Sequence, residues 1–104
     1  MPWVSRTEFE DVCIEHFLTN NPGFTVAERH PICDKITAVF RDKDGVRHPL
    51  LVTIKLGQLD AEAIVNFSRA TADIMRIDER AQRIVMLNRK DGTIGTIRAR
   101  CFRE

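Results

Sequence analysis

A short, unbroken apolar run near the end of the chain constrains the fold more than any other feature. The run from Ile84 to Leu87 is too short for a helix, and an extended chain would place an apolar residue on each of its two faces in turn. The run therefore predicts a strand that is covered on both faces. Before it, apolar residues recur at helical spacing from Asp60 to Ile77, and a predicted strand covers Arg47 to Leu56. A strand, a helix and a strand in this order form a crossover, so the two strands are expected to be parallel neighbours.

The other segments predict one more helix and three more strands. Ser5 and Glu8 form a capping-box pattern that begins a helix over about residues 6 to 19, and the cluster at 20–23 ends it. The remaining expected strands are 24–28, 34–41 and 93–102, with turns at 42–45 and 89–92. The expected fold class is therefore α/β (α+β) in the order α-β-β-β-α-β-β. It is one domain, 1–104, in which two helices pack on a mixed sheet of four or five strands, with 84–87 central.

Composition restricts the class of protein but not its function. The 43% apolar and 30% charged content is that of a globular protein. No apolar run approaches the roughly 18 residues that a membrane span needs, and acidic residues stand where a signal peptide would be apolar, so an intracellular, cytoplasmic protein is expected. The three cysteines lack metal-finger spacing and are expected to be reduced and mostly buried.

Charge differs between the two parts of the chain. Residues 1–68 carry 7 basic and 10 acidic residues, net −3, whereas residues 69–104 carry 9 and 5, net +4. Of the 16 basic residues 12 are arginine, which suits bidentate contacts to phosphate or carboxylate, although a GC-rich genome produces the same bias. The candidate residues for binding nucleic acid or a protein partner are Arg76, Arg80, Arg89, Lys90, Arg98 and Arg100.

The last strand carries two of these arginines. Arg98 and Arg100 are expected to share one face of it with Ile94 and Phe102, an arrangement that can grip phosphates or acidic groups of a partner. The alternative is a solvated edge, because charges on an edge strand also block unwanted strand pairing.

A short motif lies at the start of the second strand and the end of the third. Asp34 opens the second strand, and Thr53 and Lys55 share a face in Val52-Thr53-Ile54-Lys55 before the long helix. With the order of elements over about residues 6 to 88, this pattern resembles the restriction-endonuclease-like nucleases, the PD-(D/E)-x-K superfamily. The resemblance implies acids at positions 34 and 53 that hold Mg²⁺, which polarises a phosphodiester and activates a water, with Lys55 beside them. Glu8 matches a further acid that many members carry on the first helix.

The sequence departs from this superfamily at residue 53, where threonine replaces a metal-binding carboxylate. An uncharged hydroxyl is a poor Mg²⁺ ligand, so about half of the anionic ligation is missing. Some members place the missing acid on the following helix, where Glu62 is the candidate. The expected function is therefore a nuclease-like domain that binds nucleic acid or a protein partner without catalysis. Two alternatives stay open: an active nuclease, with Mg²⁺ as its cofactor and Glu62 as the migrated acid, and a small phage- or mobile-element-encoded inhibitor or interaction protein.

A homodimer is expected as well. The last strand ends the chain with an uncovered edge, so a second copy could join through that strand or through the long helix. Like charges at Arg98 and Arg100 would face one another in a strand-mediated dimer, and the helix-mediated dimer is therefore preferred.

Overall fold

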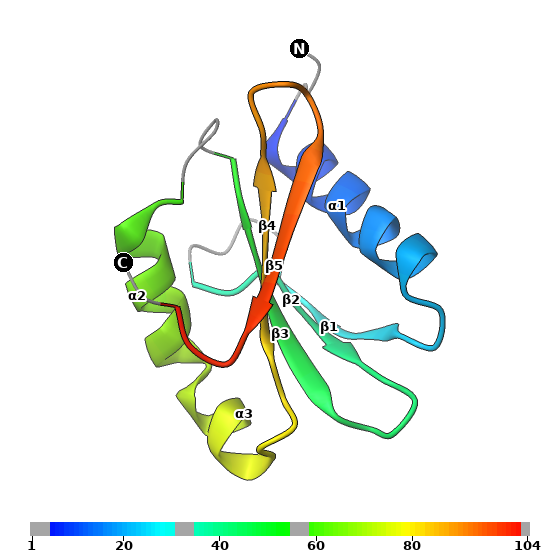
Figure 1. The fold of residues 1–104 in the computed structure, drawn as a ribbon, viewed down its shortest axis with the longest axis vertical. Helices are drawn as coiled ribbons and strands as arrows, with labels where there is room; N and C mark the ends of the chain where they lie inside the picture. The colour runs from blue at the N-terminus through cyan, green and yellow to red at the C-terminus, as the bar shows by residue number, and fades with distance from the viewer. Residues whose placement is uncertain (1–4, 31–34, 55–58, 103–104) are drawn as a thin grey trace.

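One mixed sheet runs through the centre of the computed structural model, which describes residues 5–30, 35–54 and 59–102. Its five strands lie in the order β1-β2-β3-β4-β5 (Figure 1). They are β1 (Thr25–Arg29), β2 (Ala38–Arg41), β3 (Arg47–Thr53), β4 (Arg83–Asn88) and β5 (Ile94–Ala99). Only β3 and β4 are parallel, and the other neighbouring strands are antiparallel, which confirms the predicted hairpins and crossover.

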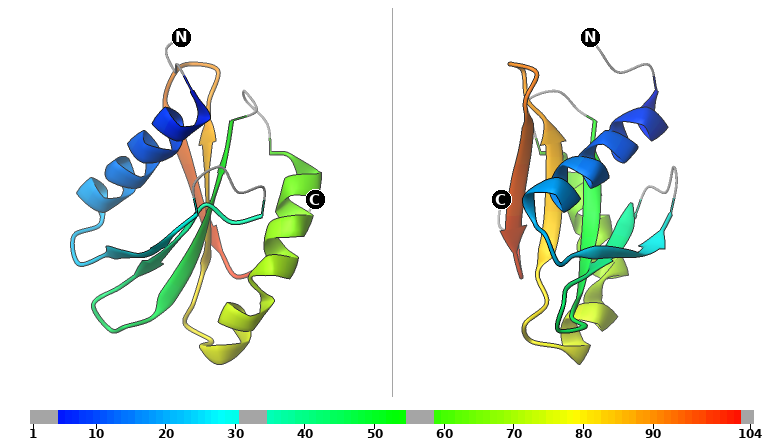
Figure 2. Two further views of the ribbon diagram at one scale, coloured as in Figure 1. Left: turned by 180° about the vertical axis from the view of Figure 1, so that it is seen from behind. Right: turned by 90° about the vertical axis from the view of Figure 1, so that its right-hand side faces the viewer.

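Helices cover the two faces of this sheet. The helix α1 (Arg6–Asn20) lies on one face, and α2 (Ala61–Ala70) and α3 (Ala72–Ile77) lie on the other (Figures 1 and 2). The hydroxyl of Ser5 accepts a hydrogen bond of 3.1 Å from the backbone N–H of Glu8, so α1 begins where its capping pattern predicts. The α+β class and the single mixed sheet of the sequence analysis are thus confirmed.

Each face of the sheet has its own apolar core. The core under α1 is built from Phe9, Cys13, Ile14, Phe17, Ala38, Phe40, Leu50, Val52, Ile84 and Met86. The core under α2 is built from Leu51, Ile64, Phe67 and Val85. Alternate residues of β4 enter opposite cores, and residues 84–86 have no exposed surface, as the apolar run predicts, whereas Leu87 at the end of that run is only half-buried. The middle strand of the sheet is β3, and β4 lies beside it.

The two described cysteines are both free but differ in exposure. Cys13 is buried, and burial, with a smaller contribution from the charge of Glu10, raises the pKa of its thiol to about 12. Cys101 is exposed, so the expectation that the cysteines are mostly buried is wrong for it.

The predicted long helix over 60–77 is broken at Thr71, so the described residues form three helices rather than two. The Thr71 hydroxyl donates to the carbonyl oxygen of Phe67 at 2.7 Å and accepts from Nε of Arg83 at 2.9 Å. Such a bond from a side chain to its own helix competes with the regular ladder and bends the helix. Arg83 also donates to the carbonyl oxygen of Ser68, so a residue of β4 satisfies the oxygens at the break.

A buried carboxylate ties α1 to the edge of the sheet. The side chain of Glu10 is 0% exposed, although a glutamate is seldom fully buried unless it is paired. Its Oε2 accepts from Nε of Arg6 at 3.0 Å, and its Oε1 accepts from Nη1 of Arg29 at 3.3 Å. Arg29 belongs to β1 and also donates to the carbonyl oxygen of Thr37 and to Asp11. The carboxylate of Glu10 can be buried because these two arginines compensate its charge, and the spacing of apolar residues does not reveal such partners.

We predict that Glu10→Ala lowers the free energy of unfolding by about 3 kcal/mol, because it leaves two part-buried guanidinium groups without their shared carboxylate. Urea denaturation followed by circular dichroism measures this. Glu15→Ala removes an exposed carboxylate from the same helix and should cost less than about 0.5 kcal/mol. Equal, small effects of the two changes would show that the buried pair contributes nothing to stability.

The turn between β2 and β3 is held by a carboxylate and a buried imidazole. Asp42 Oδ1 accepts from the backbone N–H groups of Asp44 and Val46, and Oδ2 bonds Nε2 of His48 at 2.9 Å. Nδ1 of His48 accepts from the backbone N–H of Gln82, which assigns the proton to Nε2 and links the turn to the start of β4. Desolvation raises the pKa of Asp42, but the bonds from His48 and the backbone outweigh it and hold this pKa below its usual range.

This lowered pKa predicts acid sensitivity. A carboxylate with a lower pKa in the folded state stabilises the fold fully above its unfolded pKa of about 3.9, and that contribution is lost as the pH falls through the folded value. We expect Asp42→Asn to flatten the loss of stability between about pH 5 and pH 2, measured by urea unfolding at several pH values. Asp44→Asn, in the same turn but exposed, should keep the acid sensitivity of the unchanged chain. Identical pH profiles for all three proteins would contradict the role of Asp42.

Candidate functional site

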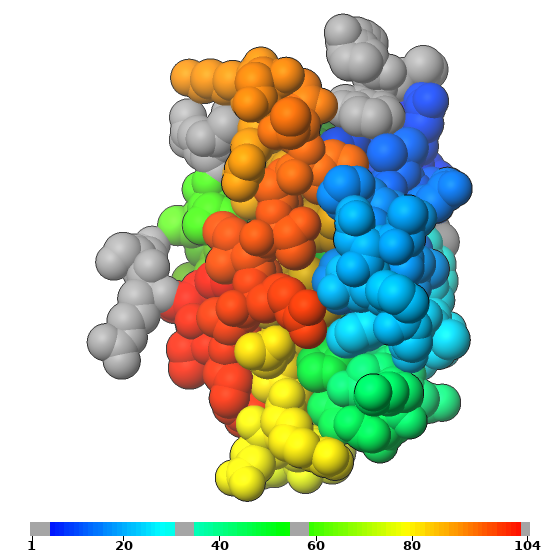
Figure 3. All heavy atoms as spheres, turned by 45° about the vertical axis from the view of Figure 1, so that its right-hand side comes forward, coloured from blue at the N-terminus to red at the C-terminus, as the bar shows by residue number. Residues whose placement is uncertain are grey.

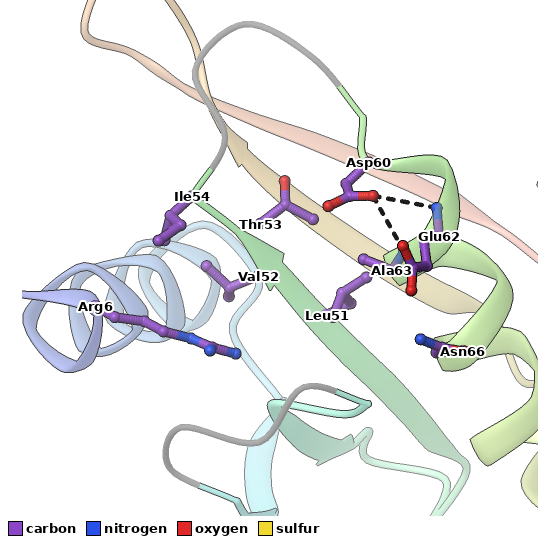
Figure 4. A pocket seen from close by; sticks show the side chains of 9 residues that line it. All are labelled: Arg6, Leu51, Val52, Thr53, Ile54, Asp60, Glu62, Ala63 and Asn66. Carbon is purple, nitrogen blue, oxygen red and sulfur yellow. Dashed lines mark hydrogen bonds between the residues drawn. The ribbon is translucent and has the colours of Figure 1, made fainter.

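A pocket of about 320 Å³ lies where β3 ends and α2 begins. It is lined by Arg6, Leu51, Val52, Thr53, Ile54, Asp60, Glu62, Ala63 and Asn66 (Figure 4). The register of the sheet explains its place, because β2 pairs with β3 only as far as Ala38 opposite Leu50. Thr37, just before β2, donates its backbone N–H to the carbonyl oxygen of Leu50, and its hydroxyl accepts from the backbone N–H of Val52. Beyond this point the described part of β2 leaves the last residues of β3 uncovered on that side.

Thr53 is the most unusual residue of the pocket. The residue is only 5% exposed, and its hydroxyl has no hydrogen-bond partner within the described ranges. In Figure 4 the hydroxyl points away from the β3 backbone on the side where Asp60 lies. A buried hydroxyl without a partner costs about 1 to 3 kcal/mol, so native proteins keep few such groups.

Two acids form the wall of the pocket that belongs to α2. Asp60 caps the helix, since its Oδ1 accepts from the backbone N–H groups of Glu62 at 3.1 Å and Ala63 at 3.3 Å. Glu62 is exposed in the first helical turn, where the positive end of the helix dipole stabilises a carboxylate. Capping and the helix dipole at the start of α2 thus explain why both acids occur there, and both residues also line the pocket.

The opposite wall comes from α1. Arg6 reaches the pocket from the first turn of that helix, and Glu10 holds its Nε from behind (Figure 4 shows the Arg6 side chain). The side chain of Arg6 is 28% exposed. With Asn66 on α2, it adds polar groups to a pocket floored by apolar residues of β3.

The structure brings together some, but not all, of the predicted site residues. Glu62 and Thr53 line the same pocket. Glu8 lies exposed in the first turn of α1 and does not line it. Asp34 and Lys55 lie outside the described residues. Sequence reasoning missed Arg6 and Asn66, and the only signal for the first was its spacing of four residues from Glu10.

The pocket offers oxygen donors, which are the ligands that Mg²⁺ prefers. Its described carboxylates are those of Asp60 and Glu62, and one oxygen of Asp60 is already used by the helix cap. Within the described ranges, no three side chains of His, Cys, Asp or Glu come together. A metal site with three or more ligands of these types would therefore need a donor from outside those ranges, whereas Mg²⁺ can also be held by one or two carboxylates together with water or phosphate oxygens.

The predicted basic surface is divided among several internal partners. Arg76 pairs with Asp73 at 2.7 Å and Arg80 with Asp78 at 3.0 Å, and hydrogen bonds from Arg80 lower the pKa of Asp78. The guanidinium of Arg100 donates to the carbonyl oxygens of Met75, Asp78, Glu79 and Ala81. These arginines thus neutralise nearby carboxylates or close the end of α3.

Arg98 does not share a face with Arg100 as expected. Its guanidinium carbon lies 5.6 Å and 5.5 Å from the ring centres of Phe17 and Phe24, on the α1 side, and it donates to Asn21. The prediction is wrong because β5 ends at Ala99, so strand alternation does not continue to Arg100. Phe102 accordingly packs on the core under α2, whereas Ile94 packs on the core under α1.

Arg89 and Lys90 lie in the turn between β4 and β5, at the opposite end of the molecule from α3 (Figures 1 and 3). Both are exposed. The predicted basic residues are therefore not gathered on one surface.

Comparison with known proteins does not identify a family. No protein-family model matches the chain, and a search of curated proteins finds no match. Within the described ranges, no helix combines the length and the apolar character needed to cross a bilayer.

Two threonine substitutions test the unusual hydroxyl of the pocket. Thr53→Val removes a buried hydroxyl that has no partner among the described residues, so we predict unchanged stability or a gain of about 1 kcal/mol. Thr71→Val, the same change at an equally buried site, removes bonds to Phe67 and Arg83 and should cost about 1 to 2 kcal/mol. Urea unfolding measures the stability of both variants. If Thr53→Val lowered the free energy of unfolding as much as Thr71→Val, the hydroxyl of Thr53 would be hydrogen-bonded in the folded protein.

Proposed function

We propose that this chain is a restriction-endonuclease-like domain that binds nucleic acid without cleaving it. The observation that carries the proposal is Thr53, a pocket residue whose neutral hydroxyl has no hydrogen-bond partner among the described residues, at the position where the resembled nucleases carry an acid. The order of elements agrees with the resemblance, since a helix and three strands precede the helical crossover and β4.

The exchange of a carboxylate for a hydroxyl changes what the pocket can bind. A carboxylate repels a phosphate unless a metal ion lies between them, whereas a hydroxyl donates a hydrogen bond to a phosphate oxygen directly. The amide of Asn66 and the guanidinium of Arg6 line the same pocket and are donors as well. Glu62 opposes this binding by its charge.

A second candidate is an active Mg²⁺-dependent nuclease with a migrated acid. It is favoured by one observation, that Glu62 and Asp60 line the pocket together with Thr53. If Mg²⁺ bound there, Glu62 and the second oxygen of Asp60 would hold it, and the ion would supply the polarisation of the phosphodiester. The acid at position 34 would have to complete the site.

The third candidate function is binding to a protein partner, as a small phage- or mobile-element-encoded inhibitor would do. The internal bonds of Arg76, Arg80 and Arg100 favour it, because they reduce the charge available to phosphates. The homodimer also stays a prediction, for which the outer edge of β5, where no other described strand pairs, and the exposed Ile77 provide surfaces.

Oligonucleotide binding with EDTA present tests the proposal. We expect labelled single- or double-stranded DNA to bind by fluorescence anisotropy without metal, with an affinity that falls steeply as salt rises. Glu62→Gln should tighten binding about threefold, because it removes a negative charge beside the phosphate. Glu15→Gln is the matched control on α1 and should change nothing. Adding Mg²⁺ or Mn²⁺ should give no cleavage.

Each other outcome points to a different function. Metal-dependent cleavage that is lost in Glu62→Gln, Asp34→Ala and Lys55→Ala would establish the second candidate. No binding to either DNA form at low salt would reject the nucleic-acid proposal and leave the protein partner.

A further inference from the structure

A glycine on the last strand of the sheet leaves room for an arginine to lie against the backbone. Gly95 of β5 is buried, and a Cβ atom placed on it would lie 2.7 Å from Nε and 3.2 Å from Nη2 of Arg89. Arg89 directly follows β4, and its guanidinium therefore covers the sheet at Gly95. A residue with a side chain at position 95 would displace this guanidinium.

This arginine lies on the same face of the sheet as the Thr53 hydroxyl, at the end where β3 stops (Figure 1). The register pairs Thr53 with Leu87 of β4, and Leu87 with Gly95, so these three residues form one row across the sheet. Leu51 and Val85, two residues before the first two members of the row, both pack under α2. Side chains two residues apart in a strand share a face, so the row faces the α2 side, where Figure 4 also places the Thr53 hydroxyl.

The far end of this row is accessible to a ligand. The Arg89 side chain is exposed and makes no hydrogen bond or ion pair with any residue that the structure describes. The acid of the same turn, Asp91, accepts hydrogen bonds from Thr93, which hold the pKa of Asp91 below its usual range, with a smaller contribution from the charge of Arg89. Ile97, on the same face of β5, is 36% exposed, so the described helices do not cover this part of the sheet.

We infer that Arg89 binds a second phosphate of the nucleic acid whose first phosphate meets Thr53, and that Gly95 positions Arg89 for this contact. The inference rests on the proposed function and adds the direction of the bound strand, from the pocket across Leu87 to β5. Two spacings between strands separate the ends of the row, about 10 Å, which is about three nucleotides of rise along one DNA strand. A mononucleotide is therefore too short to reach both ends.

The chemistry of arginine suits this contact. A guanidinium presents a planar fork of donors that matches two oxygens of a phosphate, and its charge strengthens those bonds. Because the Arg89 side chain already lies against the sheet at Gly95, it loses less rotational freedom when it binds. Its positive charge also lies outside the pocket that Asp60 and Glu62 line, where their carboxylates oppose a phosphate.

Binding of a labelled DNA oligonucleotide by the full chain in EDTA, measured across a range of salt concentrations, tests the inference. We expect Arg89→Gln to weaken binding about tenfold and to reduce the salt slope by about one phosphate contact. Lys90→Gln removes the neighbouring exposed charge of the same turn as the matched control, and it should weaken binding less than about twofold.

Gly95→Ala separates the position of Arg89 from its charge. Gly95 has no positive φ, and the added methyl group would meet side-chain atoms of Arg89 and Leu87, so the strand should keep its fold, which circular dichroism checks. We expect affinity to fall about threefold while the salt slope stays. Added to Arg89→Gln, the same change should cause no further loss, because Gly95 acts only through Arg89.

The outcomes separate this inference from the proposed function. Unaltered binding in Arg89→Gln, or equal losses in Arg89→Gln and Lys90→Gln, overturns the inference and leaves nucleic-acid binding intact. No binding by the unchanged chain overturns both. A further loss when Gly95→Ala is added to Arg89→Gln rejects the positioning role of Gly95.

A mononucleotide used as competitor tests the length of the row. Arg89→Gln should leave the affinity for the mononucleotide unchanged, and a loss as large as that for the oligonucleotide would contradict the span from Thr53 to Arg89. Should Gly95→Ala unfold, Arg89→Lys takes its place. It keeps the charge without the planar fork, so affinity should fall while the salt slope stays, and unchanged affinity would contradict the inference.

Discussion

A single buried carboxylate shared by two arginines determines how the first helix lies on the sheet. Glu10 has no exposed side-chain surface, and it binds Arg6 of its own helix and Arg29 of the edge strand. A buried charge is tolerated only when partners compensate it, so α1 is held at one orientation against β1. That orientation carries Arg6 to the pocket at the end of β3 and places Phe9 and Phe17 on the core beneath.

The pocket itself follows from the way the sheet changes direction. β3 has an antiparallel neighbour on one side and a parallel neighbour on the other, and the antiparallel pairing with β2 ends at Leu50. The last residues of β3 therefore keep a strand partner on the β4 side, as far as Thr53 opposite Leu87, but have none on the β2 side among the described residues. The start of α2 lies beside this end of β3, and Asp60 begins that helix with a side-chain cap. Thr53 is buried at this junction. A crevice at the carboxyl end of a parallel strand is a common place for ligands.

The sequence predicted the elements well and the polar contacts poorly. Periodicity and turn residues identify helices, strands and the buried run at Ile84, because burial of apolar side chains depends on local spacing. The break at Thr71 was missed because it needs Arg83, which comes from another element. The partners of Arg100 were missed for the same reason, since they are backbone oxygens at the end of α3. For the candidate site, the resemblance pointed to Glu62, which lines the pocket together with Thr53, whereas Arg6 became visible only through its bond to Glu10.

The central claim is that the pocket at the end of β3 binds phosphate groups of nucleic acid without a metal ion. Nuclear magnetic resonance of isotope-labelled protein, titrated with an unlabelled oligonucleotide in EDTA, tests it most directly because it reports where the ligand lies. The account predicts the largest shift changes at the backbone of Thr53, Ile54 and Ala63 and at the side chain of Arg6. Changes confined to the turn that contains Arg89, with none at the pocket, would contradict it.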